Sequence, residues 1–146
     1  MALTINADYL VRCINVLETA FERLLEFQPD VVVYDIYRAA CVKEFELVLE
    51  QSGRLLRMRL RDYFASNLQA DRLTFKDVFR YAARHGLLSA ESCERWLEYR
   101  DNRNDTAHDY GEGFAEQTLK PLPGFIVDAR ELASLVQDGG TDGDGA

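Results

Sequence analysis

The sequence predicts an all-α fold, an antiparallel up-and-down bundle of four or five helices. Apolar residues recur at spacings of three and four over most of the chain, as they do on the buried face of a helix. Only three of the 146 residues are proline, and glycine is scarce before the C-terminus. The expected helices are joined by short connections, which favour antiparallel neighbours. We expect one domain over residues 1–137, followed by a disordered acidic tail at 138–146.

The first two expected helices are long. The first covers residues 8–27, and Pro29 ends its pattern. The second covers 31–65 without a proline, and Gly53 is its single helix-weakening residue. Gly53 either lies inside the helix or divides it, and we favour one helix that bends at this position.

Residues 66–72 are polar and are expected to form a loop. Thr74 then caps a short third helix, with Asp77 three residues later, and Gly86 is expected to end it. Ser89 is the expected cap of the fourth helix, which should continue to Tyr110. The last helical region, 113–137, contains two prolines. It should divide into a piece that ends at Lys120 and a piece from Pro123 or Gly124 to Val136.

Composition excludes several classes of function. No apolar run approaches the roughly 20 residues of a membrane-spanning helix, and no secretory signal is visible, so we expect a cytoplasmic protein. The net charge is −8, yet residues 54–103 hold eleven basic and seven acidic side chains. Local contact with phosphate is therefore possible, although strong general binding of nucleic acid is not expected. Cys13, Cys41 and Cys93 fit buried fillers, and no metal site or cofactor motif is present at a recognisable spacing.

One segment carries residues suited to chemistry: Arg103, Asn104, His108 and Tyr110. Histidine exchanges protons near neutral pH, and the planar guanidinium of arginine matches phosphate oxygens. Asparagine can orient a hydroxyl or phosphate group without adding charge. These groups together could cleave a phosphodiester without a metal ion.

Helical geometry separates these residues into pairs. Asn104 and His108 lie about 40° apart around an ideal helix, whereas Arg103 and His108 lie about 140° apart. Tyr110 returns to the Arg103 side, about 20° away. We therefore expect either a helix that unwinds after Ala107 or a site assembled across a two-fold dimer.

A purely structural interpretation of the same residues is also available. Arg103 could pair with Asp101 or Asp105, His108 could cap a helix C-terminus, and Tyr110 could belong to the core. A short Arg-x4-His string alone favours this interpretation.

The surrounding sequence resembles the HEPN superfamily, whose motif is Arg-x(4–6)-His with a polar residue after the arginine. The sequence is more similar to the branch that pairs with a minimal nucleotidyltransferase and carries Arg-x4-His-x-Tyr, here Arg103, His108 and Tyr110. The context matches as well, in Lys43-Glu44-Phe45-Glu46, His85-Gly86-Leu87-Leu88 and Trp96-x6-Arg103-Asn104.

The resemblance implies the toxin of a toxin–antitoxin pair, acting as a metal-independent endoribonuclease and a homodimer. His108 would be the general acid/base, Arg103 would stabilise charge on phosphorus, and Asn104 would position the scissile group. The partner nucleotidyltransferase would silence the toxin by attaching AMP to Tyr110. The alternatives are a non-catalytic subunit that presents a nucleotide or polynucleotide to that partner, and a helical dimer whose motif is only structural.

Three further features have competing interpretations. The basic run at 54–61 could follow an RNA backbone, but a solvated helix face is favoured. His85 is interpreted as a helix cap rather than a second catalytic base. The aromatic residues of the second helix are expected in the core or at a dimer seam.

Overall fold

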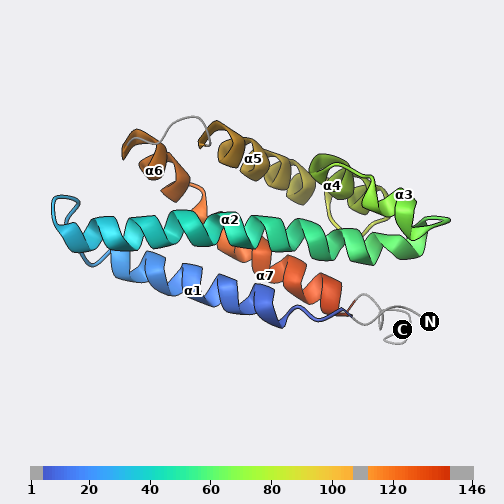
Figure 1. Ribbon diagram of the computed structural model, residues 1–146, viewed down its shortest axis with the longest axis horizontal. Helices are drawn as coiled ribbons and strands as arrows, with labels where there is room; N and C mark the ends of the chain where they lie inside the picture. Colours follow the sequence, from blue (N-terminus) through green and yellow to red (C-terminus); the bar gives the residue numbers. More distant parts are fainter. Residues whose placement is uncertain (1–4, 107–111, 139–146) are drawn as a thin grey trace.

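The computed structural model describes residues 5–106 and 112–138, and these residues form an up-and-down helical bundle (Figure 1). Helices α1 and α5 run opposite to α2, and α7 runs parallel to it. The predicted all-α bundle is confirmed. Its four long helices are α1 (Asp8–Leu24), α2 (Val32–Leu60), α5 (Ala90–Thr106) and α7 (Leu122–Asp138). Its shorter helices are α3 (Asn67–Asp71), α4 (Phe75–Arg84) and α6 (Glu112–Leu119).

Helix α2 extends along most of the molecule and organises the other helices around it (Figure 1). Helix α1 packs along one side of α2, while α4, α5 and α6 lie on the other side. Helix α7 contacts α1, α2 and α5, so its buried face closes the core between the two sides.

Helix α2 passes through Gly53 without a break, so the predicted single long helix is confirmed. A Cβ atom at this position would lie 2.7 Å from Cε2 and 2.8 Å from Cδ2 of Phe75, at the start of α4. The glycine therefore allows α4 to approach α2 more closely than any side chain would permit.

The core centres on Trp96, which is fully buried on α5. Its indole stacks on the ring of Phe79 at 4.9 Å between centroids and meets Tyr99 and Phe125 edge-on. These contacts come from α4, α5 and α7. They fix the rotation of α5 about its own axis, and with it the direction of Arg103 farther along that helix.

The ends of the shorter helices follow the predicted caps. Thr74 Oγ1 accepts from Asp77 N at 3.2 Å, and Ser89 Oγ accepts from Ser92 N at 3.0 Å. Gly86 has φ +75°, and its N–H and that of Leu87 donate to carbonyls in the last turn of α4. This is the hydrogen-bond pattern of a Schellman motif, which explains why α4 stops there.

Three predicted boundaries were wrong. The segment 66–72, expected to be a loop, contains α3, because Ser66 Oγ accepts from Gln69 N and caps a five-residue helix. The first helix ends at Leu24 rather than 27. The second ends at Leu60 and continues as a 3-10 turn, η1 (Arg61–Tyr63).

The C-terminal region divides at Pro121, close to the predicted position. Helix α7 begins at Leu122, so Pro123 lies in its first turn, where a missing N–H costs no helical hydrogen bond. The helix runs to Asp138, and residues 139–146 of the predicted tail lie outside the described residues.

Cys13, Cys41 and Cys93 are free and buried, as predicted. Burial raises the pKa of the Cys41 thiol to about 11. In the part of the chain that the structure describes, no helix is long and apolar enough to cross a membrane.

Candidate active site

The candidate site lies where the last described turns of α5 pass beside α2. Arg103 follows Trp96 by seven residues and therefore points to nearly the same side of α5. Because Trp96 is buried against the core, Arg103 is directed inward, and its side chain is only 29% exposed.

Arg103 has an acidic neighbour on another helix. Its Nη2 lies 3.8 Å from Oε1 of Glu50 on α2. Asp101, one of the partners considered from sequence, pairs instead with Lys76 on α4 at 2.6 Å. The guanidinium thus reaches across to α2 rather than lying along its own helix.

The structure places only part of the predicted motif. The backbone of Asn104 belongs to the final turn of α5, next to Arg103. His108 and Tyr110 lie outside the described residues, between the end of α5 and the start of α6. Their predicted roles therefore remain predictions.

Helix α6, which follows this segment, is anchored to α2 by a group of polar side chains. Glu116 accepts hydrogen bonds from Tyr34 Oη at 2.9 Å and from Arg38 Nη1 at 2.9 Å. Arg38 also pairs with Asp35 at 3.1 Å. Burial, followed by the hydrogen bond to Glu116, raises the pKa of Tyr34, so its hydroxyl stays a donor at neutral pH. Sequence analysis missed this group because Glu116 is 82 residues from Tyr34.

A polar cavity of about 500 Å³ opens between α5 and α6. It adjoins the motif through Asn102, which precedes Arg103. All of its lining residues except Pro121 have polar or charged side chains. Its lining residues are Glu98, Tyr99, Asp101, Asn102, Gln117, Lys120 and Pro121.

A buried carboxylate ties α5 to α7 below this cavity. Asp128 is 3% exposed and accepts from Arg95 Nε at 2.8 Å and Nη2 at 2.9 Å. It also accepts from Tyr99 Oη at 2.6 Å. Burial and the bond to Asp128 raise the pKa of Tyr99, and the bond to Asp128 raises the pKa of Arg95. This group holds α5 in place without itself reaching Arg103.

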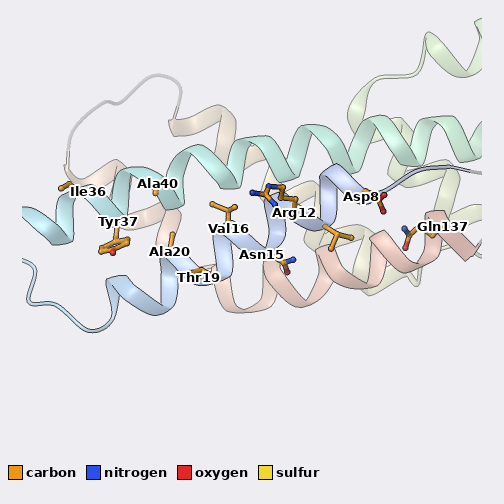
Figure 2. Close-up of a pocket in the computed structure, with 11 residues that line it drawn as sticks. Asp8, Arg12, Asn15, Val16, Thr19, Ala20, Ile36, Tyr37, Ala40 and Gln137 are labelled. Atoms are coloured by element: carbon orange, nitrogen blue, oxygen red, sulfur yellow. The ribbon is translucent and has the colours of Figure 1, made fainter.

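A larger groove lies elsewhere in the described residues. It has a volume of about 860 Å³ and is lined mainly by α1 and the first turns of α2, with Gln137 at one end (Figure 2). None of its lining residues comes from α5 or α6. The groove is therefore separate from the candidate active site.

Among residues 5–106 and 112–138, no group of three or more His, Cys, Asp or Glu side chains is arranged to hold a metal ion.

Comparison with known proteins identifies the family. The family model described as "Nucleotidyltransferase substrate binding protein like" matches residues 7–138. This protein belongs to that family. The match confirms the resemblance to the HEPN branch that pairs with a minimal nucleotidyltransferase.

One relative of this protein is named probable ribonuclease HepT and comes from Haemophilus influenzae. The two are 29% identical over 131 residues, which cover 82% of this chain and 88% of the relative. Among solved structures, HI0074 from Haemophilus influenzae is described as the substrate-binding domain of a nucleotidyltransferase. It is 26% identical with a TM-score of 0.78, over 90% of this chain and 99% of that one. A protein from Thermus thermophilus is also 26% identical, with a TM-score of 0.62, over 83% of this chain and 98% of that one.

Proposed function

We propose that this protein is a metal-independent endoribonuclease, the toxin of a pair whose antitoxin is a minimal nucleotidyltransferase. The observation that carries the proposal is the position of Arg103, partly buried beside Glu50 of α2 and one residue before Asn104 of the motif. Similarity to a protein named probable ribonuclease HepT supports the same function.

The proposed cleavage uses the 2′-hydroxyl of the RNA. Its oxygen attacks the adjacent phosphorus, the P–O5′ bond breaks, and a cyclic phosphate forms. His108 accepts the 2′ proton, and an imidazole returns a proton to the leaving 5′ oxygen. Arg103 stabilises the negative charge on phosphorus, and Asn104 positions the scissile group.

We further propose a homodimer in which two copies of the end of α5 line one cleft. On an ideal helix Arg103 and His108 point about 140° apart, so a single helix does not direct both at one atom. Two facing helices would supply the arginine of one copy and the histidine of the other, and the second imidazole would serve as the acid.

The nucleotidyltransferase is proposed to silence the toxin at Tyr110. The phenol oxygen attacks the α-phosphorus of ATP, pyrophosphate leaves, and AMP remains on the tyrosine. The new phosphate would then occupy the region of Arg103, where the phosphate of RNA would bind.

The first test compares wild type with Arg103→Ala and His108→Ala. We expect the purified wild type to cleave RNA in EDTA and to arrest growth when expressed alone, and each variant to lose both activities by 100-fold or more, on the order of losing a charge stabiliser or proton carrier. Arg23→Ala, at an exposed position of α1, is the matched control and should behave as wild type. If wild type and all variants neither cleave RNA nor arrest growth, the ribonuclease proposal is excluded.

The second test addresses silencing. After co-expression with the nucleotidyltransferase, mass spectrometry should show one added AMP on the peptide containing Tyr110 and none in Tyr110→Phe. An unmodified Tyr110 in a culture that the partner protects would contradict this part of the proposal.

The family description and the description of HI0074 support a second candidate function. In that case the protein would be a non-catalytic subunit that presents a nucleotide or polynucleotide to the nucleotidyltransferase. The polar cavity between α5 and α6 would be the binding site. This function would be favoured over the first if nucleotidyl transfer by the partner required this subunit and the subunit cleaved no RNA.

A further inference from the structure

A stacked aromatic pair lies at the surface, far along the bundle from Arg103. Tyr63 ends η1, His85 follows the last residue of α4, and their ring centroids are 4.3 Å apart with planes 24° from parallel. Tyr63 is 45% exposed, and His85 is also exposed. A large aromatic side chain that keeps this much contact with water while stacked contributes little to a core. We call this pair the Tyr63–His85 platform.

Neighbouring rings support the same end of the bundle. Phe64 packs edge-on against Tyr81 at 5.4 Å, and the guanidinium of Arg84 lies 5.3 Å from the centre of the Tyr81 ring. Arg84 and His85 therefore lie together at the end of α4, and Tyr63 stacks on His85 from η1. Such a surface is preorganised rather than assembled when a ligand arrives.

Positive charge is concentrated in the part of the chain that contains the platform. Residues 54–85, here called the basic end, hold eight Arg or Lys and three Asp or Glu, in a protein of net charge −8. Each of these three acids already pairs with an arginine of the same region: Asp62 with Arg59, Asp71 with Arg61, and Asp77 with Arg80.

Arg72 and Arg84 are exposed and form no ion pair with any carboxylate of the described residues. The basic end therefore keeps cationic groups available for an anionic partner.

The location connects this surface to the candidate active site. Figure 1 shows α3 and α4 together at one end of α2 and α6 toward the other end. Arg103 is 13 residues beyond the first residue of α5, which begins beside the end of α4, so the platform and Arg103 are separated by about 20 Å along α5. An RNA strand of several nucleotides can span that distance.

We propose that the basic end is a secondary RNA-binding surface, on which an unpaired base stacks against the Tyr63–His85 platform while Arg84 and Arg72 contact the flanking phosphates. Single-stranded nucleic acid requires both features, a ring face for the base and cations for the backbone. An acidic protein partner could bind the arginines, but it would give no reason for the exposed ring pair. The inference rests on the proposed function only in taking RNA as the substrate.

The test measures binding and cleavage separately. Binding of a fluorescent single-stranded RNA of about 12 nucleotides is followed by anisotropy in the His108→Ala background, so that the probe stays intact. We expect Tyr63→Ala and Arg84→Ala each to raise Kd about fivefold or more, within the range for losing one stacked base. Tyr63→Phe should retain wild-type affinity, because the ring is kept.

Matched controls come from the acidic part of the chain. Tyr9→Ala removes another exposed tyrosine, 54% exposed on α1, and Arg23→Ala removes another exposed arginine. Both should leave Kd unchanged, and circular dichroism should show that every variant is folded. An unchanged Kd for Tyr63→Ala and Arg84→Ala, or an equal loss in Tyr9→Ala, would overturn the proposal.

Cleavage of a dinucleotide, which is too short to reach the platform, separates this proposal from the proposed function. Tyr63→Ala should cleave the dinucleotide at the wild-type rate and long RNA more slowly. If RNA binds as predicted but nothing is cleaved, the binding surface stands and the ribonuclease proposal fails. If Tyr63→Ala weakens binding of the nucleotidyltransferase while RNA affinity is unchanged, the basic end is a protein-docking surface and the proposal is wrong.

Discussion

Arg103 on α5 and Glu50 on α2 form an ion pair between the two helices, with Nη2 and Oε1 3.8 Å apart. The distance is that of an ion pair without a short hydrogen bond. The carboxylate of Glu50 therefore restrains the guanidinium electrostatically. The pair also connects the proposed catalytic arginine to the helix that spans the molecule.

Glu50→Gln should lower the turnover of RNA cleavage more than it changes stability. Glu50 is 57% exposed, so the pair contributes ~1 kcal/mol or less, and the free energy of unfolding should hardly change. Loss of the restraint on Arg103 should lower kcat about threefold to fivefold, the kinetic equivalent of that energy, without raising KM, since a repulsive carboxylate is also removed. Steady-state kinetics and urea unfolding measure both quantities. Glu26→Gln, in the exposed pair with Arg23, is the control, and a raised KM with unchanged kcat would contradict the assigned role.

Gly53→Ala should destabilise the protein, although alanine is the better helix former. The substitution gains about 1 kcal/mol of helix propensity, but the new methyl group would overlap the ring of Phe75. That ring is held between Phe79 and the guanidinium of Arg100, so overpacking should cost about 2–3 kcal/mol and leave a net loss of about 1–2 kcal/mol. Urea unfolding measures the difference.

Gly113→Ala on α6 is the natural control, because no atom of the described residues beyond its chain neighbours and its own helix backbone lies within 4 Å of the position its Cβ would occupy. It should stabilise the protein slightly. If Gly53→Ala is as stable as Gly113→Ala, the close approach of α4 to α2 does not depend on the glycine.

Asp128→Asn should lower the free energy of unfolding by about 2–3 kcal/mol. The substitution keeps the shape of the side chain but removes the charge that Arg95 and Tyr99 bond within the bundle. The estimate is below that for a fully buried pair because Arg95 is 46% exposed. Asp101→Asn, in an exposed pair with Lys76 at 2.6 Å, is the control and should cost less than ~1 kcal/mol. Equal losses in the two variants would show that burial of Asp128 has no energetic role.

Cys41 should make stability fall at alkaline pH. Burial raises the pKa of its thiol from 9.0 to about 11, so the folded state keeps the proton while the unfolded state loses it. The stability due to this group is therefore fully present below pH 9 and is lost as the pH rises toward 11, by at most about 2–3 kcal/mol. Unfolding at pH 8 and pH 10.5 should show a smaller alkaline loss in Cys41→Ala than in wild type. An identical loss would mean that the thiol is not protected in the folded state.

Features determined by neighbouring residues were predictable from sequence, whereas those that join distant residues were not. Thr74, Ser89 and Gly86 act within one helical turn, and their predicted roles as caps and stop are confirmed. Helix α3 was missed because five residues are too few to show an apolar period, although Ser66 is a favourable cap.

The arrangement of the site depended on contacts between helices. Nothing local in the sequence pairs Arg103 with Glu50, which is 53 residues away, or Asp128 with Arg95. A continuous α2 through Gly53 was expected. The reason that a glycine is needed there, the close ring of Phe75, depends on the packing of α4 and was not visible in the sequence. The identity of the motif itself, Arg103 to Tyr110, was accessible because its residues are close in sequence.

The concentration of positive charge at the basic end also affects how the protein meets a polyanion before any contact forms. Residues 54–85 carry a net +5 from eight basic and three acidic side chains, so the rest of the chain carries −13. An approaching strand is repelled by most of the surface and attracted at one end, which orients the collision. Productive encounters should therefore become rarer as added salt shortens the reach of this field, to about 8 Å at physiological ionic strength. The same asymmetry limits indiscriminate adhesion to the abundant nucleic acid of a cell.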